Sequence, residues 1–162
     1  MSLQSLSVLC VDDEPGLAAL VGTYLERFDR TVDVTTATSA GQALAELADT
    51  EFDCIVSDYD MPGIDGLALL ESVRAERPTV PFIMYTGNGS EGVASDAVSA
   101  GVTDYVQKKT GTDQYRSLAR RIRNAAEGRR QEEEHTSAQD DTRRREAAER
   151  ILETAPDPVR QP

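Results

Sequence analysis

The stretch Ser7-Val-Leu-Cys-Val-Asp-Asp-Glu-Pro15 decides the fold class of this chain. After Ser7, four apolar residues form a short run, which is typical of a buried strand, and two aspartates end that run. Pro15 then begins a segment with apolar residues at three- and four-residue spacing, and a proline fits the first turn of a helix, with Asp13 as its expected cap. The stretch therefore predicts a strand that ends in an acidic turn and leads directly into a helix.

The same alternation of strand and helix occurs five times, through about residue 127. The predicted strands are residues 7–11, 31–36, 54–57, 81–85 and 104–106. The predicted helices are residues 15–28, 40–48, 67–75, 93–100 and a fifth from about 112 past 126. This alternation predicts an α/β fold in which helices cover both faces of a parallel sheet.

Four charged side chains lie within two residues of the ends of predicted strands: Asp12 and Asp13 after the first, Asp58 after the third and Lys108 after the fifth. The carboxyl ends of parallel strands share one edge of the sheet, where ligands bind, so we expect these side chains to meet. Three carboxylates would repel one another without a cation. Mg²⁺ favours a few carboxylates together with water and phosphate, so this edge predicts magnesium-dependent phosphate chemistry.

Asp58 begins the loop Asp58-Tyr-Asp-Met-Pro-Gly-Ile-Asp-Gly66, in which a proline and a glycine force a turn. Such a loop lifts the Asp58 carboxylate into solvent, where it could attack phosphorus and form an acyl phosphate. Thr86 comes at the end of the fourth strand, where its hydroxyl could donate to a phosphoryl oxygen. Tyr105 lies on the neighbouring strand and could turn inward as Thr86 moves, so the two residues are predicted to form a switch.

Four motifs resemble the receiver domain of two-component response regulators. They are Val11-Asp-Asp-Glu14, Asp58-Tyr-Asp-Met-Pro-Gly-Ile-Asp-Gly66, Tyr85-Thr-Gly87 and Gly101-Val-Thr-Asp-Tyr-Val-Gln-Lys108. The resemblance covers residues 5–127 and implies a flavodoxin-like sheet with strand order 2-1-3-4-5. It also implies Mg²⁺ as the cofactor, a histidine kinase as the partner, and no catalysis beyond autophosphorylation and autodephosphorylation.

The resemblance further implies a role for each residue of the predicted site. The phosphoacceptor is Asp58; the metal ligands are Asp12, Asp13, Asp58 and the backbone carbonyl of Asp60; the phosphate contacts are Thr86 and Lys108; the switch pair is Thr86 and Tyr105. The face made by the fourth helix, fifth strand and fifth helix would change on phosphorylation. A partner, or a second copy in a homodimer, would bind that face.

The chain departs from this family at Lys109, because receiver domains usually have a proline there after a cis peptide bond. A cis bond before a non-proline residue costs about 3 to 4 kcal/mol, so we expect either a trans bond or a strained site. We assign the phosphate contact to Lys108 because Tyr105 lies three residues before it.

Composition narrows the function further. The net charge of −12 argues against direct nucleic-acid binding, which needs clustered basic side chains. The acidic, lysine-poor composition is typical of salt-loving microbes and favours a haloarchaeal origin.

Cys10 and Cys54 lie in apolar runs and are expected to be buried free thiols. No secretory signal or membrane span is evident, which predicts a cytoplasmic protein.

Residues 128–162 form a second region with few large apolar side chains until residue 147. It is predicted to be a charged linker or a solvated helix, which Pro156 and Pro158 would end. Residues 144–159 resemble the lead-in of a PAS sensory domain, so the chain could be the front of a receiver-PAS sensor kinase. His135 lacks an apolar face beside it and is predicted to be exposed rather than a phosphoacceptor.

Three other functions fit parts of the pattern. An aspartyl-nucleophile phosphatase would use Asp58 and Asp60, but such enzymes usually have threonine where this chain has Pro62. A nucleotide-binding domain needs a glycine-rich turn after the first strand, where this chain has an acidic one. A receiver-like module could also bind partners without phosphorylation, and labelling at Asp58 would separate it from an active receiver.

Overall fold

The computed structural model describes residues 4–87 and 91–154, and the chain divides into two units, Met1–Arg129 and Arg130–Pro162. The first unit contains a sheet of five strands: β1 (Leu6–Val11), β2 (Val32–Ala37), β3 (Cys54–Ser57), β4 (Phe82–Thr86) and β5 (Asp104–Gln107). The helices are α1 (Pro15–Phe28), α2 (Ala40–Asp49), α3 (Gly66–Glu76), α4 (Glu91–Ser99) and α5 (Asp113–Thr154).

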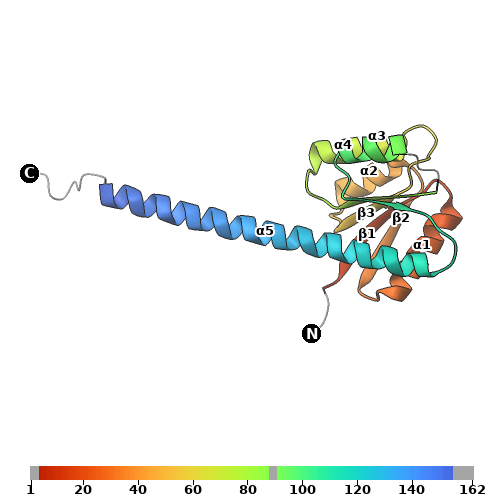
Figure 1. Ribbon diagram of the computed structural model, residues 1–162, viewed down its shortest axis with the longest axis horizontal. Coiled ribbons are helices and arrows are strands. Elements are labelled where there is room, and N and C mark those ends of the chain that lie inside the picture. Colours follow the sequence, from red (N-terminus) through yellow and green to blue (C-terminus); the bar gives the residue numbers. More distant parts are fainter. Residues whose placement is uncertain (1–3, 88–90, 155–162) are drawn as a thin grey trace, which may run out of the picture. The chain divides into compact units, whose positions relative to one another are not determined.

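The sheet is parallel throughout, with strand order β2-β1-β3-β4-β5, which confirms the predicted doubly wound fold (Figure 1). Its register aligns the carboxyl ends of the central strands. Val11 pairs with Ser57 across β1 and β3, and Thr86 pairs with Gln107 across β4 and β5. The residues that follow these pairs therefore emerge side by side at one edge.

Helices cover both faces of the sheet, so its strands are apolar on both sides. Along β1, Leu9 and Val11 join a cluster with Leu69 and Leu70 of α3. The alternate residues of β1, including Cys10, join a second cluster with α1 and α5. Cys10 and Cys54 are buried free thiols, as predicted.

The structure tests two of the predicted helix caps, Asp13 for α1 and Ser39 for α2. Ser39 caps α2 as expected, since its side chain accepts a hydrogen bond from the backbone N–H of Gln42. The predicted cap of α1 by Asp13 is wrong, because the N-cap residue is Glu14, which makes no side-chain capping bond. The carboxylate of Asp12 accepts the Glu14 N–H at 3.0 Å instead. Asp12 thus occupies the turn, and Asp13 does not serve as the cap.

The second unit, taken by itself, is helical from Arg130 to the end of α5 at Thr154, which favours the solvated helix over an irregular linker. Its side chains are exposed at residues 131–133 and 142–147. Pro156, Pro158 and the last part of the PAS-like segment lie outside the described residues. Among the helices that the structure describes, none combines the length and apolar composition of a membrane span.

Candidate functional site

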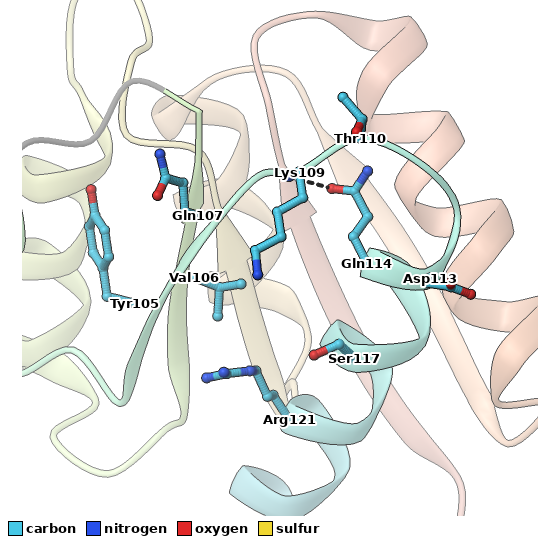
Figure 2. Close-up of a pocket in the computed structure, with 9 residues that line it drawn as sticks. All are labelled: Tyr105, Val106, Gln107, Lys109, Thr110, Asp113, Gln114, Ser117 and Arg121. Atoms are coloured by element: carbon cyan, nitrogen blue, oxygen red, sulfur yellow. Dashed lines mark hydrogen bonds between the residues drawn. The ribbon is translucent and has the colours of Figure 1, made fainter.

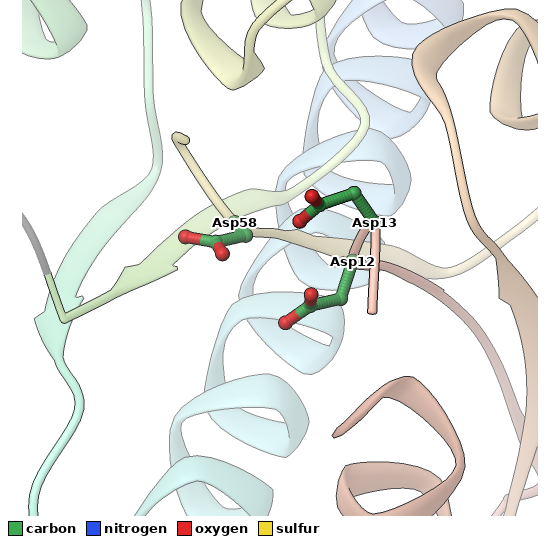
Figure 3. Close-up of side chains that lie close together, drawn as sticks. All are labelled: Asp12, Asp13 and Asp58. Carbon is green, nitrogen blue, oxygen red and sulfur yellow. The ribbon is translucent and has the colours of Figure 1, made fainter. Parts of the chain in front are cut away.

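Asp12, Asp13 and Asp58 come together because β1 and β3 end in register. The Asp58 backbone N–H donates to the Val11 carbonyl at 2.9 Å, which extends the pairing one residue past the strand ends. One carboxylate oxygen from each of the three aspartates lies within 4.8 Å of the others, on the same side of the strand ends (Figure 3). The predicted acidic cluster therefore exists in the fold.

Lys108 reaches this cluster from β5. Its backbone N–H donates to the carbonyl of Thr86 at 3.0 Å, so the β4–β5 pairing continues past both strands. Its Nζ atom lies 3.0 Å from Asp12 Oδ2 and 3.5 Å from Asp58 Oδ2. Partial burial acts to lower the pKa of the Lys108 ammonium, but hydrogen bonding and charge from Asp12 and Asp58 outweigh it and raise that pKa. Lys108 is therefore held as a cation at the carboxylates.

The two paired carboxylates have fixed orientations. Asp12 is buried, with one oxygen bound to the Glu14 N–H and the other to Lys108. Asp58 is partly exposed, and its Oδ1 accepts the N–H of Tyr59 at 2.8 Å. The three carboxylates and the one ammonium together have a net formal charge of −2. Oxygen donors with this excess charge fit a hard divalent cation.

Gly66 fixes the backbone of the Asp58 loop. A Cβ atom at residue 66 would lie 2.2 Å from the Asp58 carbonyl oxygen and 2.8 Å from the Tyr59 Cα. The Gly66 N–H donates to the Tyr59 carbonyl at 2.8 Å, and α3 begins at this residue. The close approach requires glycine, and it ties the start of α3 to the loop that presents Asp58.

The proposed switch residues lie on the neighbouring strands. Thr86 is fully buried at the end of β4. Tyr105 pairs with Met84, and its partly buried ring packs against the cluster that contains Met84. The Tyr105 hydroxyl is buried and finds no hydrogen-bond partner among the described residues. Burial raises the pKa of this hydroxyl, with a smaller contribution from Tyr59. Asp60 is exposed on the Asp58 loop.

Two residues that sequence reasoning missed hold the segment after Lys108. Gln114 Oε1 accepts a hydrogen bond from the Lys109 N–H at 3.0 Å (Figure 2). The same oxygen also accepts a hydrogen bond from the hydroxyl of Tyr85. Gln114 Nε2 donates to the Gly111 carbonyl at 2.8 Å. Tyr85 in turn places its ring 5.6 Å from Lys108 Nζ. The only sequence signal for this network is Lys109 itself, because a proline there would have no N–H to donate.

No described peptide bond is cis, so the bond between Lys108 and Lys109 is trans. Beside it, an open pocket of about 490 Å³ separates β5 from the start of α5 (Figure 2). The residues that line it are Tyr105, Val106, Gln107, Lys109, Thr110, Asp113, Gln114, Ser117 and Arg121. The pocket lies on the face that the sequence predicted for a partner.

Comparison with known proteins agrees with this geometry. Residues 8–120 match the response regulator receiver domain family, and the chain belongs to that family. Its relatives include the nitrogen assimilation regulatory protein NtrX of Azorhizobium caulinodans, 37% identical over 108 residues, which are 65% of this chain and 23% of NtrX. The C4-dicarboxylate transport transcriptional regulatory protein DctD of Rhizobium meliloti is 36% identical over 115 residues, or 71% of this chain and 25% of DctD. The matched part thus spans about a quarter of the length of these two relatives.

Solved structures give the same result. A CheY-like receiver domain protein from Methanospirillum hungatei superimposes with a TM-score of 0.71 at 27% identity, covering 81% of this chain and 99% of that one. The chemotaxis protein CheY4 of Vibrio cholerae superimposes with a TM-score of 0.66 at 27% identity, covering 73% and 98%. The chain therefore contains a receiver domain of the response regulator family.

Proposed function

We propose that Asp58 accepts a phosphoryl group from a histidine kinase in a magnesium-dependent reaction. The observation that carries the proposal is the position of the Lys108 ammonium, which lies within ion-pair distance of both Asp12 and Asp58, at 3.0 and 3.5 Å. Phosphoryl transfer depends mainly on positioning and on neutralising charge, and this arrangement offers both.

In this proposal an oxygen of Asp58 attacks phosphorus as the bond from phosphorus to the kinase imidazole breaks. The Tyr59 N–H holds Asp58 Oδ1, which orients the carboxylate before attack. Lys108 exchanges its contact with Asp58 for one with a phosphoryl oxygen, and the Thr86 hydroxyl donates to another. Asp12, Asp13, Asp58 and the backbone carbonyl of Asp60 would hold Mg²⁺, which neutralises phosphoryl charge when bound.

The test is phosphorylation by acetyl phosphate, followed by intact mass. One acid-stable, base-labile phosphoryl group should appear on the wild type and should be absent with EDTA or in Asp58→Asn. Asp60→Asn is a matched control, since the proposal uses only the backbone of Asp60, and it should still be labelled. Equal labelling of Asp58→Asn would remove Asp58 from the phosphoacceptor role.

The output surface forms a second part of the proposal. Movement of Thr86 toward the phosphoryl group would shift the Tyr105 ring and change the face made by α4, β5 and α5. Val98 is exposed on α4, and the pocket beside Lys109 opens on the same face, so a partner or a second copy has apolar and polar surface to contact. Beryllofluoride with Mg²⁺ should change amide exchange at residues 91–108 in the wild type but not in Asp58→Asn. Unchanged exchange at a saturated site would remove the switch.

The remaining proposals concern the rest of the chain. We assign residues 5–127 to the receiver domain and residues 128–162 to a charged extension leading to a PAS-like segment. The acidic composition supports a haloarchaeal origin. A longer form should then contain a sensory domain after this region, and its kinase output should respond to phosphorylation of Asp58.

A further inference from the structure

A second cavity, away from the aspartate cluster, gathers arginines in this acidic chain. It has a volume of about 480 Å³ and lies between α5 and the turn that joins α1 to β2. Its charged lining consists of Asp29, Arg30, Arg116, Arg120 and Arg123. Four cations and one carboxylate thus face a common space, although the whole chain has a net charge of −12.

The single carboxylate is already neutralised. Arg123 Nε donates to Asp29 Oδ2 at 2.8 Å, and Thr31 donates to the other oxygen of Asp29 through its N–H at 3.1 Å. Burial acts to raise the pKa of Asp29, but the bonds from Arg123 and Thr31 outweigh it and lower that pKa. Arg123 is itself buried and donates to the Gln4 carbonyl at 3.2 Å. This buried ion pair forms the floor of the cavity, and its two charges cancel.

Arg30, Arg116 and Arg120 are exposed around this floor. Within the part of the chain that the structure describes, none of them has a carboxylate oxygen within 4.0 Å. The Arg116 guanidinium lies 5.0 Å from the centre of the Phe28 ring. A guanidinium placed over a ring keeps its N–H groups available for a carboxylate or phosphate at its edge.

Aromatic side chains continue this surface along α1 and the first turns of α5, which lie side by side (Figure 1). Tyr24 stacks on Tyr115 with ring centres 4.8 Å apart, and it also packs near Phe28 with centres 6.3 Å apart. Arg27 lies 5.2 Å from the centre of the Tyr24 ring. Arginine and aromatic residues are enriched in the centres of protein interfaces, so this row has the composition of a binding surface.

We propose that this cavity and the adjoining aromatic row bind an acidic peptide segment of a partner protein. Carboxylates of the segment would pair with Arg30, Arg116 and Arg120, and its apolar side chains would contact Tyr24 and Phe28. The row extends past the cavity as far as Arg27, which fits an extended segment better than a single small anion. The charge of the lining, four arginines against one carboxylate, is complementary to an acidic segment, although the whole chain is acidic.

The test uses a short fluorescein-labelled peptide of alternating glutamate and leucine, with the glutamine–leucine peptide as the neutral probe. Fluorescence anisotropy on the full chain should show binding of the acidic peptide alone. Arg116→Gln/Arg120→Gln should weaken that binding by about tenfold or more, since it removes two charge-assisted contacts. Arg143→Gln/Arg144→Gln is the matched control, because both arginines are exposed on α5 outside the cavity, and it should bind as the wild type does.

Arg123 is left unchanged because it is buried and structural, and circular dichroism checks that both variants fold. Equal weakening in the two double variants, or no binding to the wild type, would overturn the proposal. Tripolyphosphate that binds while the acidic peptide does not would make the cavity a small-anion site instead. Self-association lost only in Arg116→Gln/Arg120→Gln would make a second copy the occupant. None of these results depends on phosphorylation at Asp58.

Discussion

The side-chain oxygen of Gln114 accepts the backbone N–H of Lys109 at 3.0 Å, which joins the segment after β5 to the first turn of α5. This contact fixes the orientation of the Gln114 amide, because an N–H group can only donate and must face the amide oxygen. The same oxygen accepts the Tyr85 hydroxyl, and the amide nitrogen donates to the Gly111 carbonyl. Gln114 thus holds the segment that carries Lys108 to the carboxylates.

Gln114→Met should destabilise the fold by about 1 to 2 kcal/mol, since the buried Tyr85 hydroxyl loses its acceptor. Gln114→Glu keeps both accepted bonds and loses only the donor to Gly111, so it should cost less. Urea unfolding measures both losses. Combining Gln114→Met with Lys109→Pro should cost less than the two single changes added together, because they remove one shared bond. Strict additivity would mean that the Lys109 contact contributes nothing.

Gly66→Ala should disturb the Asp58 loop, because the new Cβ would lie 2.2 Å from the Asp58 carbonyl oxygen. We expect a loss of several kcal/mol in unfolding free energy, together with shifted amide resonances for Asp58 and Tyr59. Gly41→Ala on α2 is the control, because its Cβ would come no closer than 4.0 Å to Ser39 Oγ. That change should be neutral or stabilise by about 0.5 to 1 kcal/mol. If both variants were equally stable, the close approach at Gly66 would be wrong.

Asp13→Asn should stabilise the magnesium-free protein, because it relieves repulsion within a cluster whose carboxylate oxygens lie within 4.8 Å of one another. The gain should be on the order of 1 kcal/mol. Added Mg²⁺ should raise the Tm of the wild type and leave that of Asp13→Asn nearly unchanged, because ligand binding stabilises only a protein that binds it. Asp33→Asn, at an exposed position on β2, should respond to Mg²⁺ as the wild type does.

The Asp29–Arg123 pair predicts a loss of stability in acid. The pKa of Asp29 is lowered in the folded state, so its contribution is present above the unfolded pKa and is lost as pH falls through the folded pKa. Asp29→Asn should therefore cost about 2 kcal/mol at pH 7. The difference from wild type should shrink once pH falls below about 4, which chemical denaturation at several pH values would reveal. A constant difference down to pH 2 would contradict this assignment.

Cys10 and Cys54 should be protected from thiol reagents in the folded protein. Burial, with a smaller effect of Asp12, raises the pKa of Cys10 to about 12, and burial likewise raises the pKa of Cys54. Since the thiolate is the reactive form, labelling at pH 8 should proceed only as fast as the protein opens. Fast labelling of either thiol without denaturant would show that the core near it is open.

The elements that position the site could be predicted because the strands are buried on both faces. Continuous apolar runs end sharply at polar residues, so the bounds of β3 and of α1 agree with the prediction. The strand ends then bring Asp12, Asp13, Asp58 and Lys108 to one edge, since parallel strands in register must end together. For these residues, the local pattern of apolar and polar residues and the topology of the sheet predict the same position.

Other features depend on contacts that no local pattern contains. Gln114 meets Tyr85 across 29 positions of sequence, and Arg123 meets Asp29 across 94. The choice between Asp12 and Asp13 at the start of α1 depends on side-chain direction, which the pair of adjacent aspartates does not reveal. Arg116, Arg120 and Arg123 follow one another at helical spacing, but only the fold adds Arg30 and creates the basic cavity.

The part of α5 after Arg129 has exposed side chains at residues 131–133 and 142–147, and among the side chains of α5 that the structure describes, Ala126 is the last in a core cluster. Most of the stability of a helix in a protein comes from packing of an apolar face, so a helical segment without such packing loses its helicity gradually with temperature rather than in one step. Calorimetry and circular dichroism should consequently disagree on this chain. The heat-absorption peak should report about 0.7 kcal/mol per residue for the receiver unit alone, while ellipticity at 222 nm already declines well below that peak. Calorimetry should therefore show one cooperative transition, while a large share of the helical signal is lost at temperatures below that transition.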